Sequence, residues 1–243
     1  VGGLKPNISS MVGGLYPLGD ERRDLGFYIF YMGINLGAFF APLLCGWVGE
    51  TYNWHYGFGL AAVGMAIGQV TYFYGQKYLV GVGDLVFSSK EEKNRLKQTK
   101  LTSIEKDRIK VLLISFLMII IFWGAFEQAG GLMNLYAKQK TDRMLLGFEI
   151  PASWFQSLNA FFIVTLAVII GGMWMRIKAK GKEASAIFKI ALGIVIMGFG
   201  FLFMRFASSE YELMGHSSMY WLVLAYLFHT VGELCASPVS LSY

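Results

Sequence analysis

Charged residues are scarce in this chain. Asp, Glu, Lys and Arg make up 15% of its 243 residues, whereas hydrophobic residues make up 55%. A soluble domain normally carries roughly 25% charged residues, so a soluble globular fold is excluded. The composition instead favours a chain that lies in a lipid bilayer.

Cysteine and histidine are also rare, which argues against metal sites and enzymes. Cys45 and Cys235 both lie in apolar stretches and have no partner at metal-ligand spacing, so neither a disulfide framework nor a metal or cofactor site is indicated. The histidines, His55, His216 and His229, are far apart, and we expect each to be satisfied or interfacial rather than catalytic. The sequence therefore does not predict an enzyme.

The chain contains several long apolar stretches. Each is about 20 residues long, enough for a helix to cross a hydrocarbon core about 30 Å thick. Because backbone polar groups must be satisfied internally in lipid, we expect helices. We also expect the chain to be the middle of a longer protein, since it starts at Val1 and stops inside an apolar segment. The prediction is a partial span at 1–12 and six whole spans at 27–48, 57–79, 109–130, 152–175, 185–206 and 219–241.

Basic residues alternate between the predicted loops. Lys and Arg concentrate on the cytoplasmic side of a membrane protein. Sixteen of the 21 lie in loops 13–26, 77–110 and 176–189, and four lie in loops 49–56, 131–151 and 205–218. The first three loops are therefore predicted to be cytoplasmic and the other three to lie outside. The net charge of +5 then reflects topology, and no nucleic-acid partner is expected.

Residues 80–108 form the one clear linker. Their charges are mixed in sign, which is typical of a solvated connector, with a role at lipid headgroups as the alternative. Thr102 and Glu105 have the spacing of a capping box and predict a helix start. We therefore divide the chain into one helical group at 1–79, a cytoplasmic linker and a second helical group at 109–243.

Ionisable residues occur inside the apolar stretches at Lys5, Glu127, Glu233 and, near an end, His229. A charge at the bilayer centre costs about 2.5–3.5 kcal/mol on insertion scales, so such a residue normally faces a partner, a cavity or a proton path. A pair such as Lys5 and Glu233 could change protonation when it separates. This pattern predicts a transporter that couples protons to movement.

Polar residues also recur four positions apart in the predicted spans, and each such pair shares one helix face. A polar strip of this kind is useful where it faces a water-filled cavity between helices. For Asn35 and Asn159, polar contact between packed helices is an equally good explanation. Glycines spaced by four, Gly33 with Gly37 and Gly64 with Gly68, favour close helix contact. The polar pairs are Tyr31 with Asn35, Trp123 with Glu127, and Glu233 with Ser237.

These residues lie in short motifs that occur in a consistent order over nearly the whole chain. The motifs are GLKPN at 3–7, RRD at 22–24, FYMGINLG at 30–37, FEQ at 126–128, WFQSLN at 154–159, and GEL at 232–234 followed by Ser237-Pro238. Together they resemble the proton-dependent oligopeptide transporter (POT) family of the major facilitator superfamily.

The resemblance implies an all-α membrane protein with two helical bundles, of which this fragment runs from the fourth to the tenth family helix. It implies a multi-pass protein of the cell inner membrane or plasma membrane that imports di- and tripeptides with protons by alternating access. Its partners would be those peptides, protons and the lipid bilayer. The alternatives are a transporter of the same fold for another small substrate, such as nitrate, an amino acid derivative or a drug-like molecule, and, less favoured, a channel.

The family motifs also imply roles for individual residues. Lys5 would form a salt bridge with Glu233, and Glu127 would act in gating or proton handling. Glu233 and Asn159 would receive the peptide amino group. The implied substrate-binding residues are Tyr31, Asn35, Trp123, Asn159, Glu233 and Ser237.

The chain departs from the family pattern in three places. Ala160 stands where proline usually follows the asparagine, and Ser240 stands where glycine is usual, which would affect helix flexing rather than substrate class. Bacterial members usually carry two extra helices between the sixth and seventh family helices, but only about thirty residues separate Tyr78 from Val111 here. Either this member lacks those helices or they are absent from the given chain.

Overall fold

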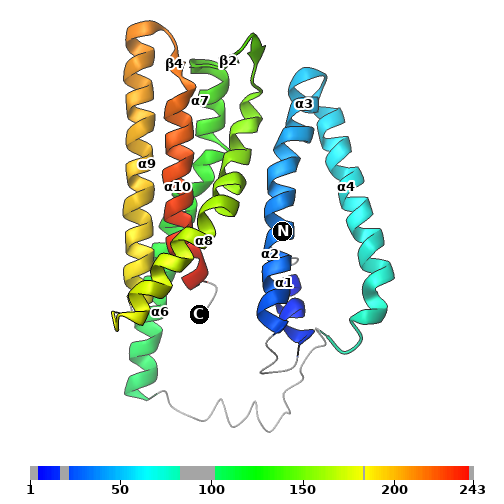
Figure 1. Cartoon of the computed structure of the whole chain (residues 1–243), viewed down its shortest axis with the longest axis vertical. Coiled ribbons are helices and arrows are strands. Elements are labelled where there is room, and N and C mark those ends of the chain that lie inside the picture. The colour runs from blue at the N-terminus through cyan, green and yellow to red at the C-terminus, as the bar shows by residue number, and fades with distance from the viewer. Residues whose placement is uncertain (1–4, 17–21, 83–101, 183, 241–243) are drawn as a thin grey trace. The chain divides into compact units, whose positions relative to one another are not determined.

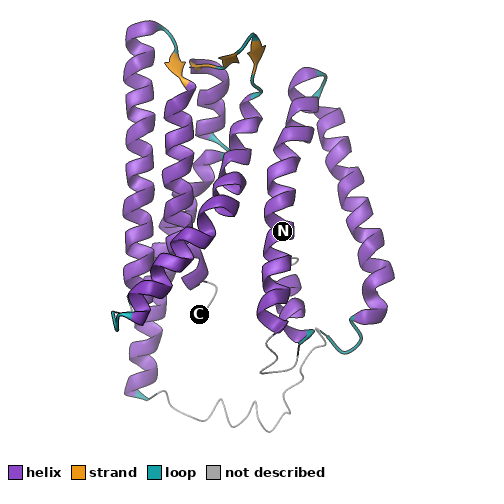
Figure 2. Cartoon of the chain, viewed as in Figure 1, coloured by secondary structure: helices purple, strands orange, loops and turns teal. Residues whose placement is uncertain are grey.

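The computed structural model describes residues 5–16, 22–82, 102–182 and 184–240. Within these ranges the backbone is almost entirely helical, and the strands that occur are two residues long (Figure 1, Figure 2). The predicted all-α fold class is confirmed.

The described residues before position 83 form helices joined by short turns. α2, η1 and α3 follow one another without a break and together cover the predicted span 27–48. In chain order the elements are α1 (Lys5–Gly14), α2 (Arg22–Ala41), the π-helical turn η1 (Pro42–Gly46), α3 (Trp47–Thr51), α4 (Trp54–Gly75) and the 3-10 turn η2 (Gln76–Tyr78).

The described residues after position 101 form longer helices with short strands at their connections. The helical elements are α6 (Ser103–Phe126), the 3-10 turn η3 (Glu127–Ala129), α7 (Leu132–Lys140), the 3-10 turn η4 (Ala152–Gln156), α8 (Ser157–Ala179), α9 (Ala186–Met214) and α10 (Met219–Ser240). The strand β1 (Thr141–Asp142) pairs in parallel with β4 (Ser217–Ser218). The strand β2 (Met144–Leu145) pairs antiparallel with β3 (Phe148–Glu149).

Apolar helical stretches long enough to cross a membrane occur at five of the six predicted spans: Ile29–Thr51, Ser103–Lys140, Ala152–Ala179, Ile187–Met214 and Met219–Ala236. The sixth predicted span, 57–79, forms the 22-residue helix α4. It is not among the five stretches. Its sequence contains Gln69 and ends in a tyrosine-rich segment, and these polar groups lower its mean hydropathy.

Two predicted loops contain more helix than we expected. Residues 131–151 include the helix α7, which ends with Lys138 and Lys140 in its last turn, where basic side chains interact favourably with a helix C-terminus. The helix α9 continues past the predicted end at 206 to Met214. It stops at Gly215, whose φ of 77° is the left-handed conformation typical of a helix end. Apolar length alone does not predict such extensions, because they contain more polar and charged residues than the stretches before them.

The predicted capping box is confirmed at the start of α6. The backbone N–H of Thr102 donates to Glu105 Oε2 at 2.7 Å, and the backbone N–H of Glu105 donates to Thr102 Oγ1 at 3.3 Å. Each residue thus satisfies a backbone donor of the other. The linker upstream of Thr102 lies mostly outside the described residues.

The contacts divide the chain into two compact units. The first comprises residues 1–34 and 62–114, and the second comprises residues 35–61 and 115–243. The predicted division at 79 and 109 stays a prediction. The second unit contains the buried core, in which seven side chains from α7, η4 and α10 pack together: Met133, Ala137, Ala152, Phe155, Leu222, Ala225 and Tyr226.

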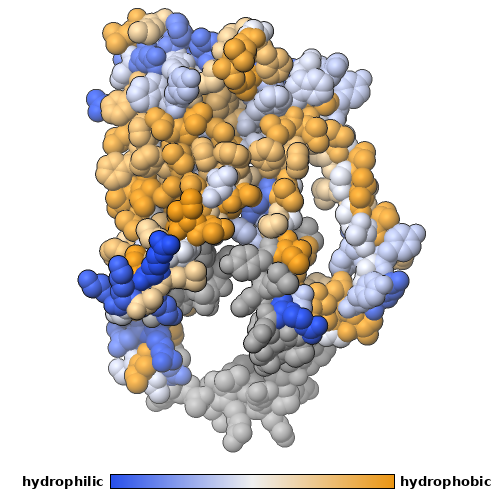
Figure 3. All heavy atoms as spheres, viewed as in Figure 1, coloured by the Kyte–Doolittle hydropathy of each residue, from blue (hydrophilic) through white to orange (hydrophobic). Residues whose placement is uncertain are grey.

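The helices α9 and α10 approach each other closely because glycines face each other. A Cβ atom on Gly193 would lie 2.6 Å from the carbonyl oxygen of Gly232, and a Cβ on Gly232 would lie 2.6 Å from the carbonyl oxygen of Gly193. Small residues permit such backbone approach between membrane helices. Large apolar side chains cover much of the visible helix surface (Figure 3), as expected where lipid replaces water.

Candidate functional site

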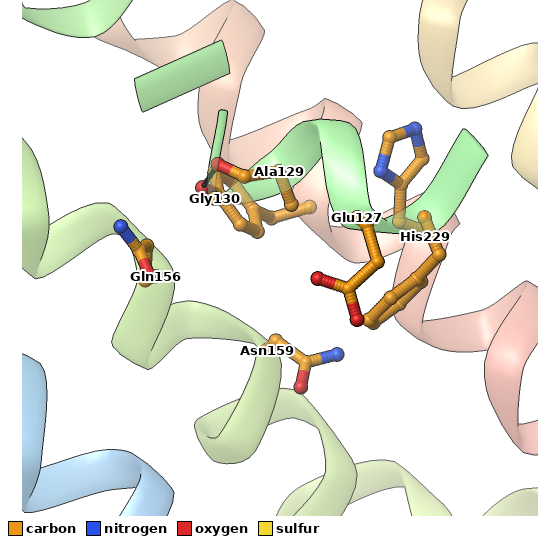
Figure 4. Close-up of a pocket in the computed structure, with 8 residues that line it drawn as sticks. Glu127, Ala129, Gly130, Gln156, Asn159 and His229 are labelled. Atoms are coloured by element: carbon orange, nitrogen blue, oxygen red, sulfur yellow. Dashed lines mark hydrogen bonds between the residues drawn. The ribbon is translucent and has the colours of Figure 1, made fainter. Parts of the chain in front are cut away.

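A pocket of about 170 Å³ lies in the second unit, where η3, α8 and α10 meet. Figure 4 shows that polar side chains from separate elements line it. The pocket is lined by Phe126, Glu127, Ala129, Gly130, Gln156, Asn159, Tyr226 and His229.

Glu127 reaches the pocket because α6 changes its winding at this residue. The α-helix ends at Phe126 and continues as the 3-10 turn η3, which is followed by Gly130 and Gly131. The Tyr226 hydroxyl donates to the carbonyl of Ala129 at 3.0 Å and thereby ties this turn to α10. In Figure 4 the Glu127 carboxylate is directed toward Asn159. An acid is thus held at the pocket by a break in the helix.

Asn159 joins α8 to α10 through its amide group. Its Nδ2 donates to Glu233 Oε2 at 2.8 Å and to Thr230 Oγ1 at 3.1 Å. The Thr230 hydroxyl donates in turn to the carbonyl of Tyr226 at 2.8 Å. The structure therefore brings together Asn159 and Glu233, the two residues that the family motifs associate with a peptide amino group.

Other predicted site residues do not line this pocket. Trp123 is half-buried and packs edge-to-face against Phe126 at 5.2 Å between ring centroids, so it touches the pocket only through its neighbour. Asn35 is buried in the second unit, whereas Tyr31 is 39% exposed and belongs to the first. Their roles in substrate binding stay predictions.

Lys5 and Ser237 lie at the two ends of the described chain. Lys5 begins α1, and Ser237 falls in the last turn of α10. Their side chains are outside the described part of the structure, so the predicted salt bridge between Lys5 and Glu233 also stays a prediction.

Three polar residues of the pocket, Gln156, Tyr226 and His229, were not predicted as site residues. Gln156 lies three positions before Asn159 in the WFQSLN motif, and that helical spacing could have indicated a shared face. Tyr226 had no comparable signal.

His229 differs from our expectation of a satisfied or interfacial histidine. The residue is 1% exposed, and neither ring nitrogen has a hydrogen-bond partner among the described residues. Its ring packs against Phe201 with 4.6 Å between centroids. An ionisable side chain is therefore buried in the wall of the pocket.

Known proteins resemble this chain over nearly its whole length. A family model described as the POT family matches residues 1–82 and 83–243. The peptide transporter YePEPT of Yersinia enterocolitica is 35% identical over 300 positions, which cover 98% of this chain and 58% of that protein. A di-/tripeptide transporter of Lactococcus lactis subsp. cremoris is 30% identical and covers 99% of this chain and 60% of that protein.

Solved structures show the same fold. A mutant of a peptide transporter POT in complex with sulfate has a TM-score of 0.84 and 33% identity, over 98% of this chain and 58% of that one. A POT family transporter in complex with 5-aminolevulinic acid has a TM-score of 0.83 and 29% identity, over 98% of this chain and 60% of that one. This chain thus spans a little under two thirds of the length of these relatives.

The alignment with YePEPT is longer than the chain. It runs over 300 positions against 243 residues, so the relative contributes at least 57 positions that have no counterpart here. The two segments matched by the family model meet at residues 82 and 83, at the predicted linker. With its motifs, its apolar helices and its matching fold, the chain is a multi-pass membrane protein that belongs to the POT family.

Proposed function

We propose that the complete protein imports di- and tripeptides together with protons by alternating access. The observation that carries the proposal is the hydrogen bond between Asn159 and Glu233 beside the pocket that Glu127 lines. The family and the relatives that are named peptide transporters support the substrate class. Binding near the midplane between helices is typical of secondary transporters.

The pocket chemistry suits the amino end of a peptide. An ammonium group has three donors and no acceptor, so it needs oxygen acceptors and a negative charge. Glu233 offers a carboxylate that is oriented by the hydrogen bond from the Asn159 amide. The same amide also donates to Thr230. We infer that the peptide ammonium takes its place beside Glu233, while Asn159 continues to hold the carboxylate in position.

Proton coupling would use carboxylates in and beside the pocket. Glu127 and Glu233 lie on separate elements, and an acid inside a membrane protein is commonly part of a proton path. We propose that protonation of one carboxylate, together with release of the bond between Lys5 and Glu233, permits the change from outward to inward access. The proton gradient would then supply the energy for uphill uptake.

The first test is uptake into liposomes that contain the full-length protein. We expect a pH gradient, acidic outside, to drive accumulation of a labelled dipeptide. Glu233→Gln should abolish this accumulation, because the carboxamide carries no negative charge and cannot bind and release a proton. The matched control is Glu149→Gln, which removes an exposed carboxylate paired with Arg143 away from the pocket. Unimpaired uphill uptake by Glu233→Gln would contradict the proposal.

A second candidate is transport of an amino acid derivative by the same pocket. It is favoured by the solved structure of a POT family transporter with 5-aminolevulinic acid, which also carries an amino group. Competition separates the two candidates: alanine dipeptides should inhibit uptake of the labelled peptide more strongly than 5-aminolevulinic acid or nitrate does. Saturable uptake with counterflow would exclude a channel.

A further inference from the structure

The end of α3 is bound to η4, the 3-10 turn that leads into α8, through the side chain of Glu50. Glu50 is the last acidic residue before the turn between α3 and α4, and its carboxylate accepts two backbone hydrogen bonds. The N–H of Ala152 donates to Oε2 at 3.0 Å, and the N–H of Ser153 donates to Oε1 at 2.8 Å. The bonded residues are more than 100 positions apart in the sequence and belong to the same compact unit.

Two further hydrogen bonds join the same two parts of the chain. The indole N–H of Trp154 donates to the carbonyl of Leu43 at 3.1 Å, and the hydroxyl of Ser157 donates to the carbonyl of Phe39 at 2.8 Å. Residues 39–50 and 152–157 are thus joined along their length. We call this set of contacts the Glu50 latch.

The latch is also closely packed. A Cβ atom on Gly46 would lie 2.2 Å from Ser153 Oγ and 2.5 Å from Ser153 Cβ, so only glycine fits without displacing the neighbouring chain. The Ser153 hydroxyl is buried and has no hydrogen-bond partner among the described residues. Its role at this point is therefore contact rather than hydrogen bonding.

The latch is connected directly to the pocket. The two N–H groups that Glu50 accepts belong to the first residues of η4, where backbone donors have no partner inside the helix. A carboxylate at such a position is favourable because the start of a helical segment carries partial positive charge. The same segment continues to Gln156 and Asn159, which line the pocket. Ser153, which Glu50 contacts, and Asn159, which lines the pocket, are thus about two helical turns apart.

We propose that Glu50 is a positioning residue that keeps the predicted outer end of the protein closed and fixes the pocket wall of α8. The loops that adjoin it, 49–56 and 131–151, contain few basic residues, which places the latch on the predicted outer side. The proposal rests on the proposed alternating access: the latch must open for a peptide to enter from outside, and it closes again when the protein turns inward.

The latch can be tested without any substrate. Spin labels at Tyr52→Cys and Leu146→Cys, both exposed positions of the second unit, report the distance between the two sides of the latch in full-length protein in nanodiscs. Native cysteines are replaced by alanine. We expect one dominant short distance in the parent. Glu50→Gln and Glu50→Ala should shift the population toward longer distances by on the order of tenfold, because two charge-assisted bonds are lost.

The matched control for this charge is Glu210→Gln. Glu210 also accepts from a backbone N–H, that of Ser218 at 3.0 Å, but it joins α9 to the start of α10 rather than crossing the latch. The label distance should therefore stay unchanged in Glu210→Gln. Glu50→Asp, which keeps the charge, should retain part of the short population. An unchanged distance in folded Glu50→Gln and Glu50→Ala would overturn the proposal.

A second pair of variants tests the close packing of the latch rather than its charge. Gly46→Ala should lengthen the label distance because its Cβ collides with Ser153, and the double variant Gly46→Ala with Ser153→Gly should restore the short distance because both colliding atoms are removed. Failure of the double variant to restore it would contradict the packing argument.

Transport kinetics separate this proposal from the proposed function. In Glu50→Gln we expect a lower KM for external dipeptide together with a lower kcat, since an open outer end favours binding from outside and delays closure. If the label distance shifts in Glu50→Gln but the parent protein transports no peptide, the latch proposal is supported and the proposed peptide substrate is rejected. If KM and kcat are both unchanged in Glu50→Gln and peptide uptake is normal, the latch alone is rejected.

Discussion

At the residue scale, the pocket contains hydrogen-bonded polar side chains as well as a buried one without a partner among the described residues. The Asn159 amide is paired with Glu233 and Thr230, whereas the buried His229 imidazole has no hydrogen-bond partner among the described residues. Leaving a buried polar group unpaired costs about 1–3 kcal/mol. An unpaired buried polar group is most readily retained where it has a function.

His229→Leu tests whether the buried imidazole has a function in transport. We expect the variant to unfold at a higher temperature, with about 1 kcal/mol of added stability, because an unsatisfied polar ring is replaced by an apolar side chain. Peptide uptake should fall at the same time, as expected where stability and activity are opposed. Thermal unfolding in detergent and uptake in liposomes measure the two effects. His216→Leu, at an exposed position, is the control that should change neither, and loss of stability in His229→Leu would contradict the argument.

Asn159 offers a second test at this scale. Asn159→Ala removes the donor that contacts both Glu233 and Thr230, so the carboxylate loses its fixed orientation. We expect the apparent affinity for a dipeptide to fall by roughly tenfold, while Gln139→Ala at an exposed position of α7 leaves it unchanged. Competition binding in detergent measures the affinity, and equal affinities in the two variants would count against a role for Asn159.

At the scale of the elements, close packing of α9 on α10 holds Glu233 in place. Gly232 directly precedes Glu233, and its backbone lies against Gly193 of α9. A second close approach occurs at Gly200, where a Cβ atom would lie 2.4 Å from the His229 ring. The polar residues of α10 therefore occupy positions that the glycines of α9 determine.

Gly193→Ala should weaken this packing. The added Cβ meets the carbonyl of Gly232 at 2.6 Å, and overpacking of this kind costs about 1–3 kcal/mol. The matched control is Gly198→Ala on the same helix, where no atom lies within 4 Å of the added Cβ. The control should be neutral or slightly stabilising, because alanine is the better helix former. Thermal unfolding measures both variants, and equal stability of the two would contradict the role of the glycine contact.

The glycines illustrate what the sequence could and could not predict. Spacing by four pointed to Gly33, Gly37, Gly64 and Gly68, but a Cβ atom at any of these positions meets nothing within 4 Å in the part of the chain that the structure describes. Close contacts occur instead at other glycines, among them Gly46, Gly193, Gly200 and Gly232. Spacing shows which residues share a face of one helix, whereas contact depends on which face the next helix approaches. That information is not local.

The site residues divide in the same way. Asn159 and Glu233 were predicted from short motifs, and their side chains meet. Tyr226 and His229 carry no motif, and only the packing of α10 places them at the pocket. Apolar length predicted the membrane helices well, because the bilayer imposes that length regardless of tertiary contacts. It did not predict α7 (Leu132–Lys140), which lies beyond the predicted span 109–130.

At the scale of the whole molecule, the charge distribution predicts an orientation that the helices can test. The 23-residue helix α8 is long enough to cross the hydrocarbon core, so we expect its two ends to lie on opposite sides of a membrane. The short hairpin of β2 and β3 precedes its start, and a run of basic residues follows its end.

Cysteine labelling checks this orientation. Leu146→Cys, at a fully exposed position in the hairpin, should react with a membrane-impermeant maleimide in intact cells. Lys182→Cys, also exposed and on the basic side, should react only after the membrane is permeabilised. Labelling of both positions in intact cells, or the reverse pattern, would refute the predicted topology.

The hairpin of α9 and α10 has a consequence for biosynthesis. Its helices are adjacent in the chain, Gly215 ends the first, and Glu210 binds the backbone of Ser218 just before the second begins. Contacts this local form quickly because little chain entropy is lost in closing them. The pair can therefore assemble as it leaves the ribosome and serve as a template against which the earlier-made helix α8 docks. The acid and the amide of the pocket would then first meet late, in a step that follows insertion.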